Sequence, residues 1–164
     1  MIRALAFEEL KEVQRLAHLI WPVAYKEILS QEQLAYMLDW MYSEQSLRQQ
    51  VDEGHLYFGI FEEIKQVGFM DIQFNCGPIG EAKLNKLYVL PDYHGKKLGY
   101  QLLQKGIELA KENGQKTLIL QVNRHNKAFE FYKKVGFSIR EEKDFDIGNG
   151  YFMNDYVMEL KLDC

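Results

Sequence analysis

The first third of the chain has the apolar spacing of amphipathic helices. One helical face carries Leu10, Val13, Ala17 and Ile20. We expect this helix to end at Trp21-Pro22, because proline lacks the N–H that the next helical hydrogen bond requires. Ser30, with Gln33 three residues later, has the capping-box pattern of a second helix. A third, short helix is expected from about residue 43 to just before Gly54.

The middle of the chain has the shorter apolar runs of β-strands. Residues 55–61 and 66–74 are rich in aromatic and β-branched side chains, and the polar residues between them predict an antiparallel hairpin. Residues 82–90 follow a glycine-rich turn as a third strand. Residues 117–122 are almost continuously apolar, which indicates a strand buried on both faces. Residues 155–162 form the last expected strand.

Two more helices are expected, at residues 99–112 and 126–135. The order strand, helix, strand over residues 82–122 is long enough for a crossover that leaves the two strands parallel. Ligands of such sheets gather at the carboxyl ends of the strands. The pattern therefore predicts one α/β domain over residues 1–164, with a ligand site where the strand at 82–90 ends.

The polar residues change this picture most in the segment LYVLPDYHGKKLG, residues 87–99. Lys96 and Lys97 lie between Gly95 and Gly99, directly before a helix. Unpaired backbone N–H groups and the helix dipole make such a helix start favourable for an anion. An ordinary surface turn has the same local pattern, so this segment alone leaves both interpretations open.

Composition narrows the class of protein. The 164 residues are 47% hydrophobic, with no stretch near the roughly 18 apolar residues of a membrane span, and the start lacks a secretion-signal pattern. We therefore expect a cytoplasmic protein. The net charge of -4 argues against nucleic acid as a partner. Cys76 and Cys164 are too few for a disulfide framework or a metal-ligand cluster, so free thiols and no metal are expected.

Three segments follow in fixed order: LYVLPDYHGKKLGYQLL, LILQVNRHNKAFEFYKKVGF and NDYVMEL. Together, over roughly residues 66–162, they resemble the GNAT (Gcn5-related) N-acetyltransferase superfamily. The block Asn-x-x-Ala-x-x-Phe-Tyr-x-x-x-Gly-Phe at 126–137 is the most specific part. The resemblance implies an α/β fold (α+β in some schemes) with a mixed, centrally splayed sheet flanked by helices. It also implies acetyl-CoA as cosubstrate. Residues 20–43 are similar to the bacterial spermidine/spermine acetyltransferase branch.

The resemblance implies that acetyl-CoA lies along the strand edge and the basic loop. The implied contacts are Leu87, Tyr88, Val89, His94, Gly95, Lys96, Lys97, Leu98, Gly99, Tyr100, Asn126 and Tyr132. The loop departs from the family pattern at His94, where Arg or Gln is usual, and at Lys97, where the first Gly is usual. If position 97 needs a left-handed backbone, lysine costs about 1 kcal/mol there. Alternatively, its ammonium helps to hold the phosphates. Asn126 has an equal claim as a helix N-cap.

Acetyl transfer to an amine requires a neutral amine, a stabilised oxyanion and a proton for the departing thiolate. By resemblance, the Val89 N–H polarises the thioester carbonyl and Tyr132 is the general acid. An amine with a pKa near 10.4 is neutral only about once in 2,500 molecules at pH 7, so a base is expected. Relatives often have Glu at the position of Lys83. The substitutes left open here are Asp71, Glu27 and Tyr36.

The acceptor site is the least defined part. Trp21, Tyr25 and Tyr36 are candidates for cation–π contact with a cationic acceptor, worth roughly 0.5–2 kcal/mol per contact, and core packing is the alternative for each.

We expect an acetyl-CoA-dependent N-acetyltransferase that acts by direct attack in a ternary complex. The favoured acceptor is a polyamine or another small primary amine, with protein or peptide amines next. A non-catalytic acyl-CoA-binding regulatory module is the alternative, because the usual Glu is Lys83. No nucleic-acid or membrane partner is expected. The oligomeric state stays open, a homodimer included.

Overall fold

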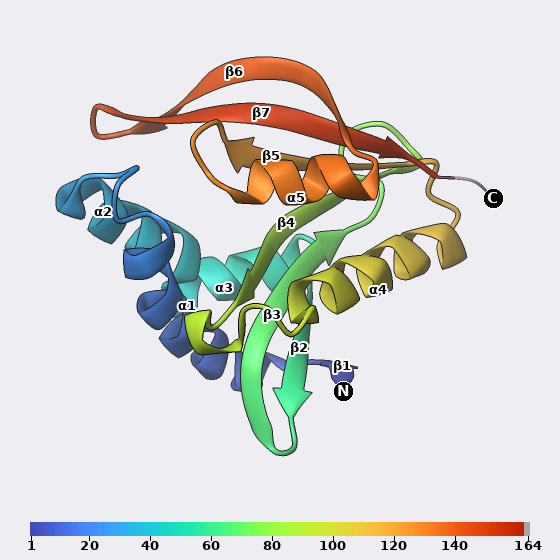
Figure 1. Ribbon diagram of the computed structural model, residues 1–164, viewed down its shortest axis with the longest axis horizontal. Coiled ribbons are helices and arrows are strands. Elements are labelled where there is room, and N and C mark those ends of the chain that lie inside the picture. The colour runs from blue at the N-terminus through green and yellow to red at the C-terminus, as the bar shows by residue number, and fades with distance from the viewer. Residues whose placement is uncertain (163–164) are drawn as a thin grey trace.

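A computed structural model describes residues 1–162 as one seven-stranded sheet with helices on both faces (Figure 1). The strands are β1 (Ile2–Ala4), β2 (Leu56–Glu62), β3 (Lys65–Gln73), β4 (Glu81–Val89), β5 (Thr117–Asn123), β6 (Ser138–Gly148) and β7 (Tyr151–Lys161). The helices are α1 (Leu10–Ala24), α2 (Gln31–Tyr42), α3 (Glu44–Asp52), α4 (Leu98–Glu112) and α5 (Ala128–Val135), with short 3-10 turns η1 (Phe7–Glu9) and η2 (Pro91–Tyr93). Cys76 is a free thiol, and Cys164 lies outside the described residues.

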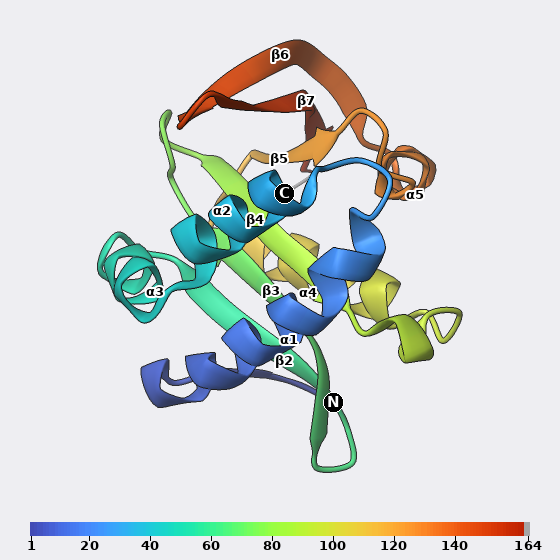
Figure 2. The same cartoon turned by 90° about the vertical axis from the view of Figure 1, so that its left-hand side faces the viewer.

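The helices form a layer on each face of the sheet (Figures 1 and 2). α1, α2 and α3 cover one face, where Trp21 and Tyr42 pack against Phe69 of β3. α4 and α5 cover the other, where Leu102 of α4 shares a core with Leu118 of β5. The central strands are therefore held from both sides, which fixes the position of any site built on them.

Serine caps set the starts of α2 and α3. The Ser30 hydroxyl accepts a hydrogen bond from the Gln33 N–H at 3.1 Å, and the Ser43 hydroxyl accepts one from the Ser46 N–H at 3.1 Å. Each bond satisfies a donor that the first helical turn leaves free. The predicted starts of both helices are therefore confirmed.

The first helix continues past the predicted stop. α1 ends at Ala24 and contains Pro22 in its last turn. The prediction that it ends at Trp21-Pro22 is wrong because a proline this close to the helix end leaves only the His18 carbonyl without its helical donor. The Tyr25 N–H still donates to the Trp21 carbonyl at 2.9 Å, so the turn closes normally.

β4 and β5 run parallel and then separate. They pair only where Glu81–Leu84 lies beside residues 117–120. Beyond Leu84, β4 stays with β3 and β5 stays with β7, and a β-bulge at Asn85 marks the point of divergence. The mixed, centrally splayed sheet flanked by helices is confirmed, as is the parallel crossover.

β5 is not buried equally on its two faces. Leu118, Leu120 and Val122 are buried, whereas the alternate residues are only partly covered. The prediction of a strand buried on both faces is therefore wrong for the second face. The side chains there, Gln121 and Asn123 among them, line an open pocket instead of a helix layer.

Two strands were not predicted, β1 and β6. β6 is almost entirely exposed and pairs only with β7. The hairpin it forms with β7 reaches over α2 (Figure 1), where the Tyr36 hydroxyl donates to the Ile147 carbonyl at 2.6 Å. Gln33 of α2 donates to the Phe152 carbonyl at 2.8 Å. The hairpin therefore ties the end of the sheet to the α1–α3 layer.

Within residues 1–162, no helix has the length and apolar content needed to cross a membrane. Over the same residues, no group of three or more His, Cys, Asp or Glu side chains is placed to hold a metal ion.

Candidate active site

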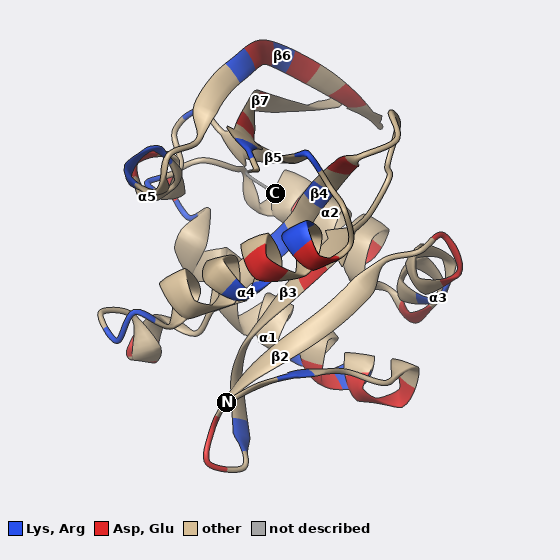
Figure 3. Cartoon of the chain, turned by 90° about the vertical axis from the view of Figure 1, so that its right-hand side faces the viewer, with Lys and Arg blue, Asp and Glu red and all other residues tan. Residues whose placement is uncertain are grey.

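The loop between β4 and α4 presents positive charge at a helix start (Figure 3). Gly95 and Lys97 have positive φ angles of 86° and 61°, and no side chain caps the start of α4. The ammonium groups of Lys96 and Lys97 are exposed. Free N–H groups, the positive end of a 15-residue helix and two lysines together suit a phosphate group. Lys97 does adopt the left-handed backbone that favours glycine.

His94 connects this loop to β4. Its Nε2 lies 3.0 Å from the Val89 carbonyl oxygen. Because a carbonyl can only accept, His94 Nε2–H is the donor, which leaves Nδ1 without that proton in the neutral ring. His94, which replaces the usual Arg or Gln, therefore links the loop to the end of β4 by a hydrogen bond.

The edge of β4 that faces the splay offers unpaired peptide groups. The Leu90 N–H donates to the Val67 carbonyl of the β3 segment at 2.8 Å. Since peptide groups alternate sides along a strand, the N–H groups of Leu87 and Val89 point away from β3, into the opening between β4 and β5. Two N–H groups at this spacing can pair with an extended amide chain or polarise a carbonyl.

Three tyrosines lie near one another beside β4. The Tyr25 hydroxyl, just after α1, lies 2.9 Å from the Tyr88 hydroxyl of β4. Tyr132 of α5 is 7% exposed and packs edge-on against the Phe137 ring. Burial, and secondly the neighbouring Tyr25, raise the pKa of Tyr132 above its ordinary value. Its phenol therefore keeps its proton at neutral pH.

Asn126 serves the start of α5. Its side-chain oxygen accepts a hydrogen bond from the Ala128 N–H at 2.9 Å, which is a capping contact. Its side chain also lies close enough to the Tyr25 hydroxyl to lower the pKa of that phenol, although burial has the larger effect and raises it. Asn126 can therefore cap α5 and also lie beside Tyr25.

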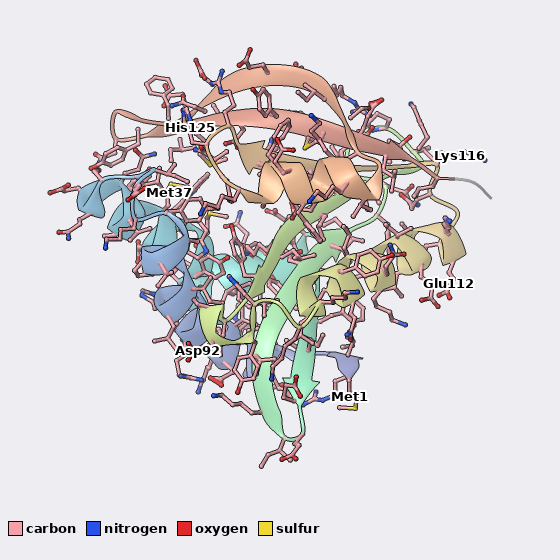
Figure 4. All side chains as sticks on the ribbon, in the orientation of Figure 1. Met1, Met37, Asp92, Glu112, Lys116 and His125 are labelled. Atoms are coloured by element: carbon pink, nitrogen blue, oxygen red, sulfur yellow. The ribbon has the colours of Figure 1, made fainter. Side chains whose placement is uncertain are left out.

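A pocket of about 450 Å³ opens on the face covered by α1–α3. We call it the acceptor pocket. Its floor is formed by Lys83, Leu84, Asn85, Lys86, Tyr88, Gln121, Asn123, Met153 and Asp155, and its walls by Trp21, Tyr25, Leu29, Met37, Trp40, Met41, Ser46, Gln49, Gln50, Glu53 and His55. Figure 4 labels Met37 on the α2 wall of this pocket. It also labels Asp92, in the loop that follows β4, and Lys116, which lies near the opposite end of that strand.

Of the aromatic residues predicted for substrate binding, the structure brings two into the acceptor pocket. Trp21 and Tyr25 line it, with their rings 4.8 Å apart. Tyr36 does not, because its hydroxyl donates to the Ile147 carbonyl under the β6–β7 hairpin. The Trp21 indole N–H is buried beside the Tyr42 ring.

A charged network supports one end of the pocket. Asp71 is fully buried and lies 2.6 Å from His55 Nδ1 and 3.6 Å from Lys86 Nζ. The Lys86 ammonium also donates to Gln50 Oε1 at 2.6 Å. Burial lowers the pKa of Lys86 to about 8, against the opposing pull of Asp71. Asp71 is therefore committed to His55 and Lys86 beneath the pocket and does not line it.

The other two residues proposed to replace the usual catalytic Glu, Glu27 and Tyr36, also lie outside the acceptor pocket. Glu27 is exposed outside the acceptor pocket, and Tyr36 is used as described above. Sequence reasoning missed His55, Lys86 and Asp155, which do line the pocket. One signal existed for Asp155: a lone carboxylate within the otherwise apolar start of the segment DYVMEL.

Comparisons with known proteins identify the family. The model of the Acetyltransferase (GNAT) domain matches residues 25–160. A spermidine N(1)-acetyltransferase of Thermoplasma acidophilum is 29% identical over 99% of this chain and 97% of its own. The crystal structure of PaiA N-acetyltransferase from T. acidophilum in complex with coenzyme A is 28% identical, with a TM-score of 0.81 over 98% of each chain.

A ribosomal-protein-S18-alanine N-acetyltransferase from Escherichia coli shares the fold, with a TM-score of 0.75 at 21% identity over 100% of this chain and 94% of that one. The domain match covers most of the chain. The chain therefore belongs to the GNAT acetyltransferase family.

Proposed function

We propose that this protein transfers the acetyl group of acetyl-CoA to the primary amine of a small molecule, by direct attack in a ternary complex. The observation that carries the proposal is that the free edge of β4 and the acceptor pocket adjoin each other. Tyr88 belongs to both. Its hydroxyl lies 2.9 Å from the hydroxyl of Tyr25, which also lines the pocket. An amine in the pocket thus approaches the place where a thioester on β4 would lie.

The cofactor half of the site fits an extended nucleotide-linked thioester. When bound, acetyl-CoA supplies the activated acetyl group. The Gly95–Gly99 loop and the start of α4 hold its phosphates, and the N–H groups of Leu87 and Val89 pair with the arm and the thioester carbonyl. Tyr132 supplies the proton for the leaving sulfur. Asn126 positions α5 beside this centre.

The first acceptor to test is a polyamine, because a relative that aligns over nearly the whole chain is named for spermidine. The pocket's aromatic walls, Trp21, Trp40 and Tyr25, offer π-faces to an ammonium group. Other small amines, and protein or peptide amines, are the next candidates.

A second function, an acyl-CoA-binding regulatory module without turnover, is favoured by one observation: Lys83 lines the pocket where relatives often have Glu. Release of free CoA thiol from acetyl-CoA, measured with a panel of polyamines, amino acids, aminoglycosides and peptides, separates the two. We expect thiol release with at least one amine. Saturable calorimetric binding of acetyl-CoA without thiol release from any amine supports the regulatory module, and no binding heat at all contradicts both.

Lys97→Gly is expected to separate backbone strain from phosphate binding. The lysine φ of 61° lies in the left-handed region, so glycine should raise the free energy of unfolding by about 1 kcal/mol. Loss of the exposed ammonium should weaken acetyl-CoA binding by roughly two- to fivefold. Urea denaturation and calorimetry measure the two effects.

Lys96→Gly is the matched control, because it removes the same charge at a position without positive φ. It should weaken binding similarly and give no gain in stability. Equal stability changes in the two variants would show that Lys97 is not strained.

A further inference from the structure

A carboxylate without a partner lies in the floor of the acceptor pocket. Asp155 of β7 is only 5% exposed, yet it lines the pocket. Over residues 1–162 its side chain makes no hydrogen bond and no ion pair. Buried carboxylates are normally paired or hydrogen-bonded, because a buried charge is costly when nothing compensates it. The missing partner of Asp155 must therefore come from the pocket side.

The protein's own cations do not supply that partner. The charged groups that face Asp155 are Lys83 of β4, Arg124 after β5, and Lys143 and Asp144 of β6, with the phenol of Tyr25 after α1. Arg124 is turned to Glu142, at 2.7 Å, and to Asp144. Burial outweighs the attraction of Arg124 and Lys83 and raises the pKa of Asp155 to about 6. At neutral pH the side chain is a buried anion that opens on the pocket.

Asp155 lies at the acyl end of the pocket. It is paired in register with Asn123, the last residue of β5 and the β5 side of the splay. Its charge acts on Tyr25, whose hydroxyl lies 2.9 Å from that of Tyr88 on the β4 side. The carboxylate therefore lies on the β7 side of β5, one strand away from the splay, and lines the same pocket as both tyrosines.

His55 is the rival base, and its surroundings differ. Its Nδ1 lies 2.6 Å from Asp71 and 3.4 Å from the Asn85 amide nitrogen. These contacts place it at the β-bulge, with Lys86 close by. Among residues 1–162, no hydrogen bond or ring contact links His55 to the three tyrosines. A base that serves the acyl centre is better placed at Asp155.

We propose that Asp155 binds the ammonium group of the acceptor and removes its proton. This inference rests on the proposed function. The carboxylate takes one N–H proton, which leaves a neutral amine and a neutral Asp155. The nitrogen lone pair forms the C–N bond with the acetyl carbon as the C–S bond breaks, and the sulfur takes the proton of Tyr132. The Tyr132 phenolate then takes a second N–H proton from the product nitrogen, and Asp155 returns its proton to water.

The test compares the pH dependence of kcat/KM for wild type and Asp155→Asn, by thiol release with the best acceptor amine at saturating acetyl-CoA. Wild type should rise to about pH 6, where Asp155 ionises, and then stay level up to the pKa of the amine. The variant depends on amine that is already neutral, so its rate should rise about tenfold per pH unit. The deficit should be about 10³-fold at pH 7 and nearly vanish at pH 10.

A weakly basic amine sharpens this comparison. Trifluoroethylamine is largely neutral at pH 7 and needs no base, so wild type and Asp155→Asn should acetylate it within about threefold of each other. Asp39→Asn, an exposed carboxylate on α2 outside the acceptor pocket, controls for the loss of one negative charge and should keep the wild-type profile. His55→Gln tests the rival and should also keep the level region.

Thermal stability gives a readout that needs no turnover. Because the folded-state pKa of Asp155 is raised above that of the unfolded chain, its ionised form destabilises the fold above about pH 6. Asp155→Asn should therefore melt above wild type at pH 8, and the gap should close as the pH falls through 6 toward 4.

The outcomes are distinguishable. If wild type is active and Asp155→Asn keeps the level region of the pH profile of kcat/KM, this inference is overturned and the proposed function is left intact. The same conclusion follows if only His55→Gln loses that level region. Melting curves whose difference does not change with pH also overturn it. Wild type that binds acetyl-CoA but releases no thiol with any amine overturns the proposed function and this inference together.

Discussion

Tyr132→Phe is expected to lower kcat by about 10²–10⁴-fold, the range that general acid catalysis contributes, while acetyl-CoA affinity changes little. The phenol is buried at 7% exposure, and burial raises its pKa. It therefore holds its proton until a thiolate forms beside it. Phenylalanine keeps the ring contact with Phe137, so the fold and the α5 position should be preserved. Steady-state thiol release and calorimetry measure the two quantities.

Two variants make the assignment to Tyr132 specific. Tyr151→Phe removes a phenol from β7, where the ring packs on Tyr36, and should leave kcat unchanged. Tyr25→Phe removes the hydroxyl that pairs with Tyr88. A fall in kcat larger for Tyr25→Phe than for Tyr132→Phe would transfer the acid role to Tyr25, and an unchanged kcat in Tyr132→Phe would remove that residue from the reaction.

Local sequence signals were sufficient for the elements whose ends are chemically marked. Ser30 and Ser43 cap α2 and α3 because a serine hydroxyl satisfies a free N–H. The loop before α4 was also predictable, since its charges, glycines and helix start lie within 13 consecutive residues. Its left-handed residue, Lys97, was foreseen only as a condition, because the family pattern places glycine there.

β6 gave no such signal. Its sequence, SIREEKDFDIG, is mostly charged and alternates apolar and polar residues only over its last residues, because only the Ile147 end packs against a helix layer. Its strand form depends on pairing with β7. β1, with three residues, depends in the same way on β2. Edge strands that take their stability from a partner cannot be read from their own residues.

The acceptor pocket was beyond sequence reasoning for a different reason. Its lining comes from the three N-terminal helices and their connections, and from strands on both sides of the splay. Asp155 and Lys83 are 72 positions apart in the sequence. They face one pocket only because β4 and β5 separate after Leu84 and leave that part of the sheet uncovered. The family resemblance implied the splay, but which side chains meet across it depends on register and on the bulge at Asn85.

Asp71→Asn is expected to lower the free energy of unfolding by about 3–5 kcal/mol, the cost of leaving one partner of a buried ion pair uncompensated. The substitution keeps the size of the side chain and an acceptor for His55, so the main loss is the charge opposite Lys86. Both Asp71 and Lys86 are nearly inaccessible, at 0% and 4% exposure. Urea denaturation at pH 7 measures the loss.

The pH dependence of that loss identifies Lys86 as its cause. Burial already lowers the pKa of Lys86 to about 8, and Asp71 is the group that opposes this shift. Without Asp71 the folded-state pKa should fall further below the unfolded value, so the unfolded chain binds more protons and the stability of the variant should rise from pH 7 to 10. Adding Lys86→Met to Asp71→Asn removes the uncompensated charge and should recover much of the lost stability. A deficit that is the same at both pH values, and that Lys86→Met does not reduce, would show that the loss comes from the His55 contact instead.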